Sequence, residues 1–171
     1  IALMNVGGVI EQLATPDDLL RAPANEFVES FVGEDRGLRR LALNTVSALR
    51  FHQGPVVDQA AGYDEAEQAI AREGTDWLGI TIDGRFAGWT RVDDVRAARA
   101  DGTPLTDVER FPPSAQVERT STLRAAMELI MSSNSSVAVI HDAGRFGGVI
   151  TLEDIRRALS SDDIEAAHGN V

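Results

Sequence analysis

The stretch GRFGGVITLEDIRRAL, from Gly144 to Leu159, occurs twice in this chain of 171 residues. Sixty residues earlier the sequence reads GRFAGWTRVDDVRAA, from Gly84 to Ala98, and the two copies align without a gap. Seven of the fifteen aligned positions are identical: Gly84/Gly144, Arg85/Arg145, Phe86/Phe146, Gly88/Gly148, Asp94/Asp154, Arg96/Arg156 and Ala98/Ala158. Identity of this extent at a fixed offset indicates an internal repeat.

The repeat continues towards the N-terminus through apolar pairs at the same offset: Val57/Val117, Ala66/Ala126, Ile70/Ile130 and Ile80/Ile140. Each copy therefore contains helices and strands and makes up about half of a small domain. A repeated unit with an apolar face is stabilised by packing against its copy. Two copies predict an α/β fold with a pseudo-twofold pair of units and a shared cleft.

Periodicity and turn residues predict a helix, two strands joined by a turn and a closing helix in each copy. In the second copy the predicted elements are a helix over 123–131, a strand over 136–141, a turn at 142–144, a strand over 145–150 and a helix over 152–159. The equivalent elements of the first copy are predicted at 65–72, 77–82, 83–84, 85–90 and 92–99. Phe86 and Phe146 are predicted to be core residues.

The first 44 residues precede the repeats and have a different pattern. Residues 1–12 predict a β-hairpin, since Gly7 and Gly8 separate two apolar runs. Thr15 and Pro16 predict a helix start, and 24–32 predicts a second helix that ends at Gly33. We divide the chain into an N-terminal part (1–44), repeat 1 (45–102), repeat 2 (103–160) and an acidic tail (161–171) that we expect to fray.

Composition excludes several classes of function. There is no cysteine, so disulfides and thiolate chemistry are excluded, and all 16 basic residues are arginine, so the lysine of phosphate-binding loops is missing. The net charge of −11 argues against nucleic-acid binding. We find no membrane-spanning run, no signal peptide and no initiator Met, and we therefore expect a piece of a longer chain.

Nothing in the sequence supports catalysis or metal binding. The three histidines, His52, His141 and His168, have no metal-ligand spacing and are predicted to lie on the surface. Neighbouring acids such as Asp93 and Asp94 point apart on a helix, so we expect no carboxylate dyad.

The N-terminal part resembles the end of the ATP-binding subunit of osmoprotectant (glycine betaine, carnitine, choline, proline) ABC importers. The resemblance rests on IALMNVGGVIEQLATPDDLL and PANEFVESFVGEDRGLRRL, within residues 1–41. The Walker A, signature and Walker B motifs of that family would lie upstream, so no ATPase activity is assigned to this stretch. The resemblance implies a hairpin and helices left over from an ABC ATPase domain.

The repeats resemble cystathionine-β-synthase (CBS) domains, whose tandem pairs form a Bateman module. The resemblance implies that each copy is a β-α-β-β-α unit. In that family the residues matching Thr151 and Asp154 contact phosphate and ribose, and apolar walls near Val117, Val137 and Ala138 hold adenine. In repeat 1 the matching residues are Asp94, Arg91 and its neighbour Thr90. The implied ligands are AMP, ATP or cyclic di-AMP.

Each of these positions also has a structural explanation. Thr-x-x-Asp is an ordinary helix cap, and Arg91 is either a phosphate ligand or a solvated residue of a degenerate site. Gly88 and Gly148 indicate either close backbone approach or packing. For Trp77 and Trp89 the alternatives are stacking on a nucleotide base, or a place in the core or at a dimer contact.

The family resemblance implies a regulatory module that senses a nucleotide and modulates ATP-driven transport. The implied partners are a second copy through the CBS modules, a membrane permease and an extracytoplasmic solute-binding protein, at the cytoplasmic face of the plasma membrane. The alternative is a ligand-free dimerisation or ionic-strength-sensing module, for which Arg36, Arg39 and Arg40 would supply a basic patch towards anionic lipid. A stand-alone CBS protein is a third alternative.

Overall fold

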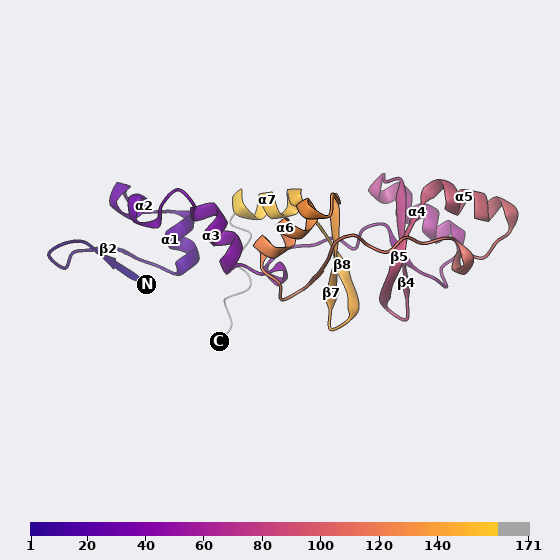
Figure 1. Cartoon of the computed structure of the whole chain (residues 1–171), viewed down its shortest axis with the longest axis horizontal. Coiled ribbons are helices and arrows are strands. Elements are labelled where there is room, and N and C mark those ends of the chain that lie inside the picture. The colour runs from indigo at the N-terminus through magenta and orange to yellow at the C-terminus, as the bar shows by residue number, and fades with distance from the viewer. Residues whose placement is uncertain (161–171) are drawn as a thin grey trace.

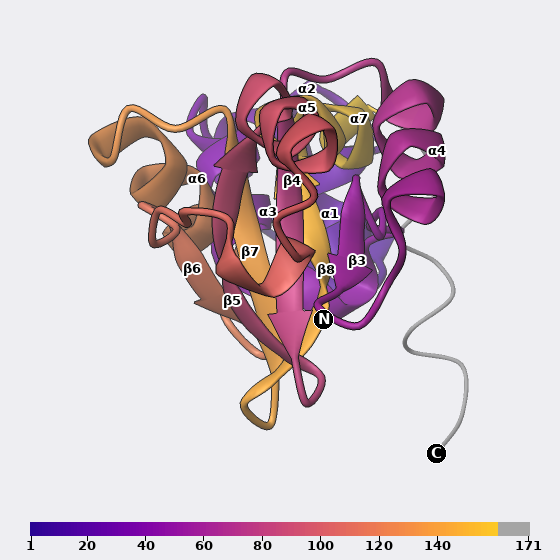
Figure 2. The ribbon, with the colours of Figure 1, turned by 90° about the vertical axis from the view of Figure 1, so that its right-hand side faces the viewer.

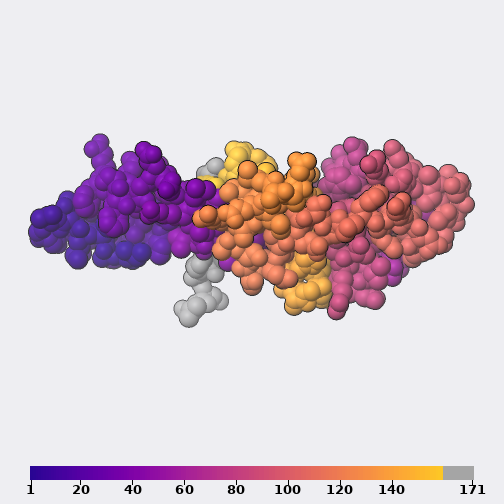
Figure 3. Space-filling model, viewed as in Figure 1, coloured from indigo at the N-terminus to yellow at the C-terminus, as the bar shows by residue number. Residues whose placement is uncertain are grey.

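The computed structural model describes residues 1–160, which form three units in a row (Figure 1). The N-terminal unit lies at one end of the elongated molecule, the second repeat in the middle and the first repeat at the other end (Figure 3). The predicted acidic tail, 161–171, lies outside the described residues.

The N-terminal unit is a hairpin followed by short helices, as predicted. Its elements are β1 (Ala2–Met4), β2 (Ile10–Leu13), α1 (Pro16–Arg21), α2 (Glu26–Val32) and α3 (Arg36–Leu43). The Thr15 side chain accepts the Asp18 N–H and starts α1. Helix α2 begins two residues later than predicted, because Asn25 caps it by accepting the Val28 N–H. Leu3, Leu19, Leu20, Val28 and Val32 form a separate small core.

Each repeat is a three-stranded sheet with two helices. Repeat 1 contains β3 (Val56–Asp58), α4 (Tyr63–Glu73), β4 (Trp77–Ile82), β5 (Arg85–Arg91) and α5 (Val92–Asp101). Repeat 2 contains β6 (Gln116–Glu118), α6 (Leu123–Ser132), β7 (Val137–Asp142), β8 (Arg145–Thr151) and α7 (Leu152–Ser160). In both sheets the first two strands are parallel and the hairpin strands are antiparallel. The predicted β-α-β-β-α order is confirmed.

The helices cover one side of each sheet, and the two sheets face each other (Figure 2). Ile140 and Ile150 lie in the core between sheet and helices of repeat 2, together with Leu123 and Ile155. Phe86 and Phe146 are half-buried where the sheets meet, with ring centroids 5.6 Å apart. The prediction of two core phenylalanines is therefore corrected: the pair joins one repeat to the other.

The segment that leads into each repeat packs on the other repeat. The 3-10 turn η1 (Val46–Ala48) lies at the start of repeat 1 in our division, yet Val46 and Leu49 belong to the core of repeat 2. The turn η2 (Leu105–Asp107) lies at the start of repeat 2, and its Leu105 belongs to the core of repeat 1. Each repeat is thus completed in space by residues that our division of the sequence assigns to its partner.

Two glycines allow the leading segment of each repeat to pack closely on the other repeat. A Cβ on Gly148, at φ +141°, would lie 2.7 Å from the His52 carbonyl oxygen, and one on Gly88, at φ +150°, would lie 2.8 Å from that of Phe111. The sequence left close backbone approach and packing open for these positions. The structure shows close backbone approach at both.

Candidate functional site

Thr151 and Asp154 meet where β8 runs into α7. The Thr151 hydroxyl donates to Asp154 Oδ2 at 2.7 Å, and the Thr151 N–H donates to the same oxygen at 2.9 Å. In return the Asp154 N–H donates to Thr151 Oγ1 at 3.2 Å. These bonds satisfy backbone donors at the helix start, which is the capping role considered for the motif.

The second oxygen of Asp154 contacts a residue that lies far from it in the sequence. His52 Nε2 lies 3.1 Å from Asp154 Oδ1. The His52 side chain is 56% exposed, whereas Asp154 is only 6% exposed. The prediction placed His52 on the surface without a role, and no sequence signal could have paired residues 102 positions apart. They meet because the segment leading into repeat 1 packs on repeat 2.

A small cavity of about 70 Å³ opens beside this contact. It is lined by Leu49, Arg50, Asp154, Arg157 and Ala158. Arg157 Nη1 is 3.8 Å from Asp154 Oδ1. The buried acid Asp154 and two arginines, Arg50 and Arg157, therefore line one cavity beside α7.

Opposing effects set the ionisation of Asp154. Its burial raises the pKa, but hydrogen bonds from the hydroxyl and N–H of Thr151 and from His52 act more strongly in the other direction. The pKa of Asp154 therefore lies below its ordinary value, and the group is a carboxylate at neutral pH. A carboxylate there can only accept hydrogen bonds.

The equivalent position in repeat 1 is different. Arg91 is at the N-cap of α5 and makes no side-chain cap bond, and both Arg91 and Asp94 are exposed. Thr90 is 1% exposed and occupies the place of the core residue Ile150. Its hydroxyl has no hydrogen-bond partner among the described residues. The bond between cap residue and acid that joins Thr151 to Asp154 in repeat 2 therefore has no equivalent between Arg91 and Asp94 in repeat 1.

The apolar candidates of repeat 2 are buried. Val117 and Ala138 belong to the core of repeat 2. Val137 is buried and pairs with Thr151 in the β7–β8 register. None of the three borders the cavity beside Asp154, and their part in holding adenine stays a prediction.

The two tryptophans pack on each other in repeat 1. Their ring centroids are 4.4 Å apart at an edge-on angle, and Phe86 contacts Trp89 in the same way at 4.5 Å. Of the two explanations for these rings, the described contacts fit an aromatic cluster on the sheet.

The basic patch expected at Arg36, Arg39 and Arg40 is not present as a patch. Arg40 is 4% exposed and pairs with Asp17, and Arg36 pairs with Glu29 at 3.0 Å. Of the three, Arg39 alone is exposed and forms no ion pair with another described residue. This correction removes the main sequence argument for a lipid-facing surface.

Comparison with known proteins identifies the repeats. The family model of the CBS domain matches residues 107–161. A solved CBS domain pair/ACT domain protein from Thermotoga maritima matches with a TM-score of 0.55 at 19% identity, covering 68% of this chain and 96% of that one. Residues 107–161 match the CBS domain, and the two repeats together have the fold of a CBS-domain pair. The structure of CBSX2 in complex with AMP shares this fold, with a TM-score of 0.51 at 20% identity, covering 67% of this chain and 95% of that one.

Beyond the CBS pair, similarity extends over nearly the whole chain. The osmoprotectant import ATP-binding protein OsmV of Salmonella typhimurium is 32% identical over 165 residues. The match covers 94% of this chain and 42% of OsmV. The chain thus spans about two fifths of the length of this relative, which is an ATP-binding subunit of an osmoprotectant importer.

Among residues 1–160, none of the helices has the length and apolar character needed to span a membrane. Within residues 1–160, no group of three or more His, Cys, Asp or Glu side chains is placed to hold a metal ion.

Proposed function

We propose that this chain is the regulatory CBS module of the ATP-binding subunit of an importer for glycine betaine or a related quaternary amine. We further propose that an adenine nucleotide, AMP, ATP or cyclic di-AMP, binds beside Asp154 and modulates ATP-driven transport. The observation that carries the proposal is the buried Asp154 carboxylate, which borders a cavity with Arg50 and Arg157 at the start of α7. Support also comes from the relatives and from the AMP complex of CBSX2.

The groups at this position suit the parts of a nucleotide. An ionised carboxylate accepts hydrogen bonds from the two hydroxyls of a ribose. Guanidinium groups such as those of Arg50 and Arg157 pair with phosphate through two parallel hydrogen bonds. The start of a helix adds its partial positive charge.

The size of the cavity indicates that nucleotide binding would require a conformational change. A volume of about 70 Å³ is well below the roughly 300 Å³ of the smallest ordinary organic-ligand sites. A nucleotide can therefore enter only if the segment from Arg50 to His52 moves away from α7, which breaks the bond between His52 and Asp154. A ligand that binds only the opened arrangement shifts the population towards it.

The whole importer supplies the partners in this proposal. The module pairs with a second copy through the CBS domains, and the parent chain binds a membrane permease that receives solute from an extracytoplasmic binding protein. This places the module at the cytoplasmic face of the plasma membrane, on a parent chain that hydrolyses ATP.

One observation favours the ligand-free alternative. Both oxygens of Asp154 already have partners within the chain, from Thr151 and His52. A module that only dimerises, or that responds to ionic strength, needs nothing more at this position. Its exposed pairs, such as Arg99 with Asp64 at 2.7 Å, would weaken as salt rises.

Calorimetric titration of the purified chain with AMP, ATP and cyclic di-AMP separates the two functions. Under the proposal, one of them binds saturably, and Asp154→Ala reduces its affinity at least tenfold. Asp94→Ala is the matched control, because it removes the equivalent carboxylate of repeat 1 from an exposed position, and it should leave affinity unchanged. Absence of binding in the folded wild type, or equal binding by D154A, would refute the nucleotide site.

A further inference from the structure

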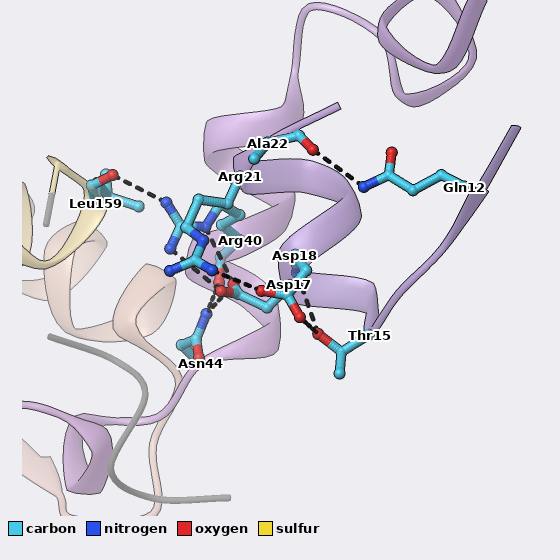
Figure 4. A network of polar contacts seen from close by, with 9 residues as sticks. All are labelled: Gln12, Thr15, Asp17, Asp18, Arg21, Ala22, Arg40, Asn44 and Leu159. Atoms are coloured by element: carbon cyan, nitrogen blue, oxygen red, sulfur yellow. Dashed lines mark hydrogen bonds and ion pairs between the residues drawn. The ribbon is translucent and has the colours of Figure 1, made fainter. Parts of the chain in front are cut away.

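A buried arginine lies between the N-terminal unit and repeat 2. Arg40, on α3, donates from Nε to Asp17 Oδ1 at 3.0 Å and from Nη2 to Asp17 Oδ2 at 3.2 Å. From Nη1 it donates to the backbone oxygen of Leu159 at 2.9 Å. Asn44 Nδ2 completes the network by donating to Asp17 Oδ1 at 2.8 Å (Figure 4). We call these four residues the Arg40 joint.

Only arginine can make all of these bonds at once. Its planar guanidinium directs two donors at the Asp17 carboxylate and a third towards Leu159 on the other side. A lysine ammonium is a single point of charge and cannot cover both partners in this geometry. Burial raises the pKa of Asp17, but the hydrogen bonds from Arg40 and Asn44 and the charges of Arg40 and Arg21 outweigh it, so Asp17 is ionised.

The joint is connected to the candidate site by one helix. Helix α7 begins after Thr151 and extends to Ser160, a length of about 13 Å at 1.5 Å per residue. Its first turn carries Asp154, and Leu159, near its other end, accepts the bond from Arg40. Because a hydrogen-bonded helix moves as a unit, a shift of its first turn also moves the backbone oxygen that Arg40 holds.

The other side of the joint belongs to the N-terminal unit. Asp17 is on α1, whose Leu19 and Leu20 lie in the core of that unit. Leu41, next to Arg40, is packed in the core of repeat 2 instead. Helix α3 therefore packs into repeat 2 through Leu41 and is bonded to α1 through Arg40 and Asp17, so the joint fixes α1 relative to α7 (Figure 4).

We propose that the Arg40 joint is the connection through which α7 moves the N-terminal unit, so that occupancy of the Asp154 site reaches the ATPase part of the parent chain. This rests on the proposed function for the identity of the ligand and of the parent. It adds a defined route: Asp154, α7, Leu159, Arg40 and Asp17.

The test uses the complete importer in lipid vesicles and measures ATP hydrolysis with and without AMP or cyclic di-AMP, whichever binds. Wild type should change its rate at least twofold on addition of the nucleotide. Arg40→Lys and Asp17→Asn should lose that change while nucleotide affinity stays within twofold of wild type. Arg39→Lys is the control, since Arg39 is exposed on the same helix, and it should keep the full response. A full response in folded R40K or D17N would overturn the proposal.

A second arm needs no nucleotide. Thr151→Ala removes the hydroxyl that caps α7 and so perturbs the helix start directly. It should change the basal ATPase rate in the wild-type background but not in the R40K or D17N background. If Thr151→Ala changes the basal ATPase rate equally in every background, or in none, the proposed role of the Arg40 joint is overturned. Failure of any nucleotide to bind would instead count against the proposed function.

Discussion

At the scale of single residues, Thr90 is the position where the two repeats differ most sharply inside the core. Its hydroxyl is buried without a hydrogen-bond partner among the described residues, whereas repeat 2 has the apolar Ile150 at that place. Thr90→Val keeps the shape and removes the unpaired group, so it should raise the free energy of unfolding by about 1 kcal/mol. Thr81→Val is the control, because its hydroxyl bonds to Val57 O, and it should not stabilise. Urea denaturation measures both, and a destabilised T90V would contradict this assignment.

Asp17 makes stability depend on acid pH. Its folded-state pKa is lowered, so its contribution is fully present above the unfolded value of about 3.9 and is lost as pH falls through the folded value. Asp17→Asn leaves Arg40 buried without its charge partner and should cost about 3 kcal/mol at pH 7. The difference in free energy of unfolding between wild type and D17N should become smaller towards pH 3. Asp18→Asn, in an exposed pair, should show little effect at either pH. A gap that is constant with pH would be evidence against an ionised Asp17.

At the scale of elements, the exchange of leading segments depends on glycine. Gly148→Ala should destabilise by about 3 kcal/mol, because the new Cβ meets the His52 backbone and φ is +141°. Gly144→Ala is the control: its φ of +77° also favours glycine, but nothing lies within 4 Å of the added atom. It should therefore cost only about 1 kcal/mol. Thermal unfolding measures both variants. If they lose the same free energy of unfolding, the close approach of Gly148 to the His52 backbone does not contribute to stability.

Most elements could be predicted from the sequence because local signals define them. The strand over 77–82 has the predicted bounds, and the first helix ends where Pro23 follows within two residues. The site could be predicted only in part. The Thr151–Asp154 cap is local, but His52 and Arg50 reach α7 through the exchanged segments, and no local pattern records that. The same holds for Arg40, which looked like one residue of a surface patch and is buried by α1 and α7.

At the scale of the whole molecule, three cores in a row are joined by a few specific contacts. Repeat 1 meets repeat 2 through facing sheets and exchanged segments, and repeat 2 meets the N-terminal unit through α3 and the Arg40 joint. The candidate site and the joint are at opposite ends of α7. A movement at one end therefore has a defined path to the other, which suits a module that regulates rather than catalyses.

The central claim is that a nucleotide competes with His52 for Asp154, and one measurement addresses it directly. AMP and cyclic di-AMP are titrated calorimetrically into wild type and His52→Ala. Removing the competitor should tighten binding about fivefold, which corresponds to about 1 kcal/mol for a hydrogen bond from an exposed side chain. Tighter binding by H52A is the predicted result. Weaker binding by H52A, or no binding by either protein while both are folded, would contradict the account.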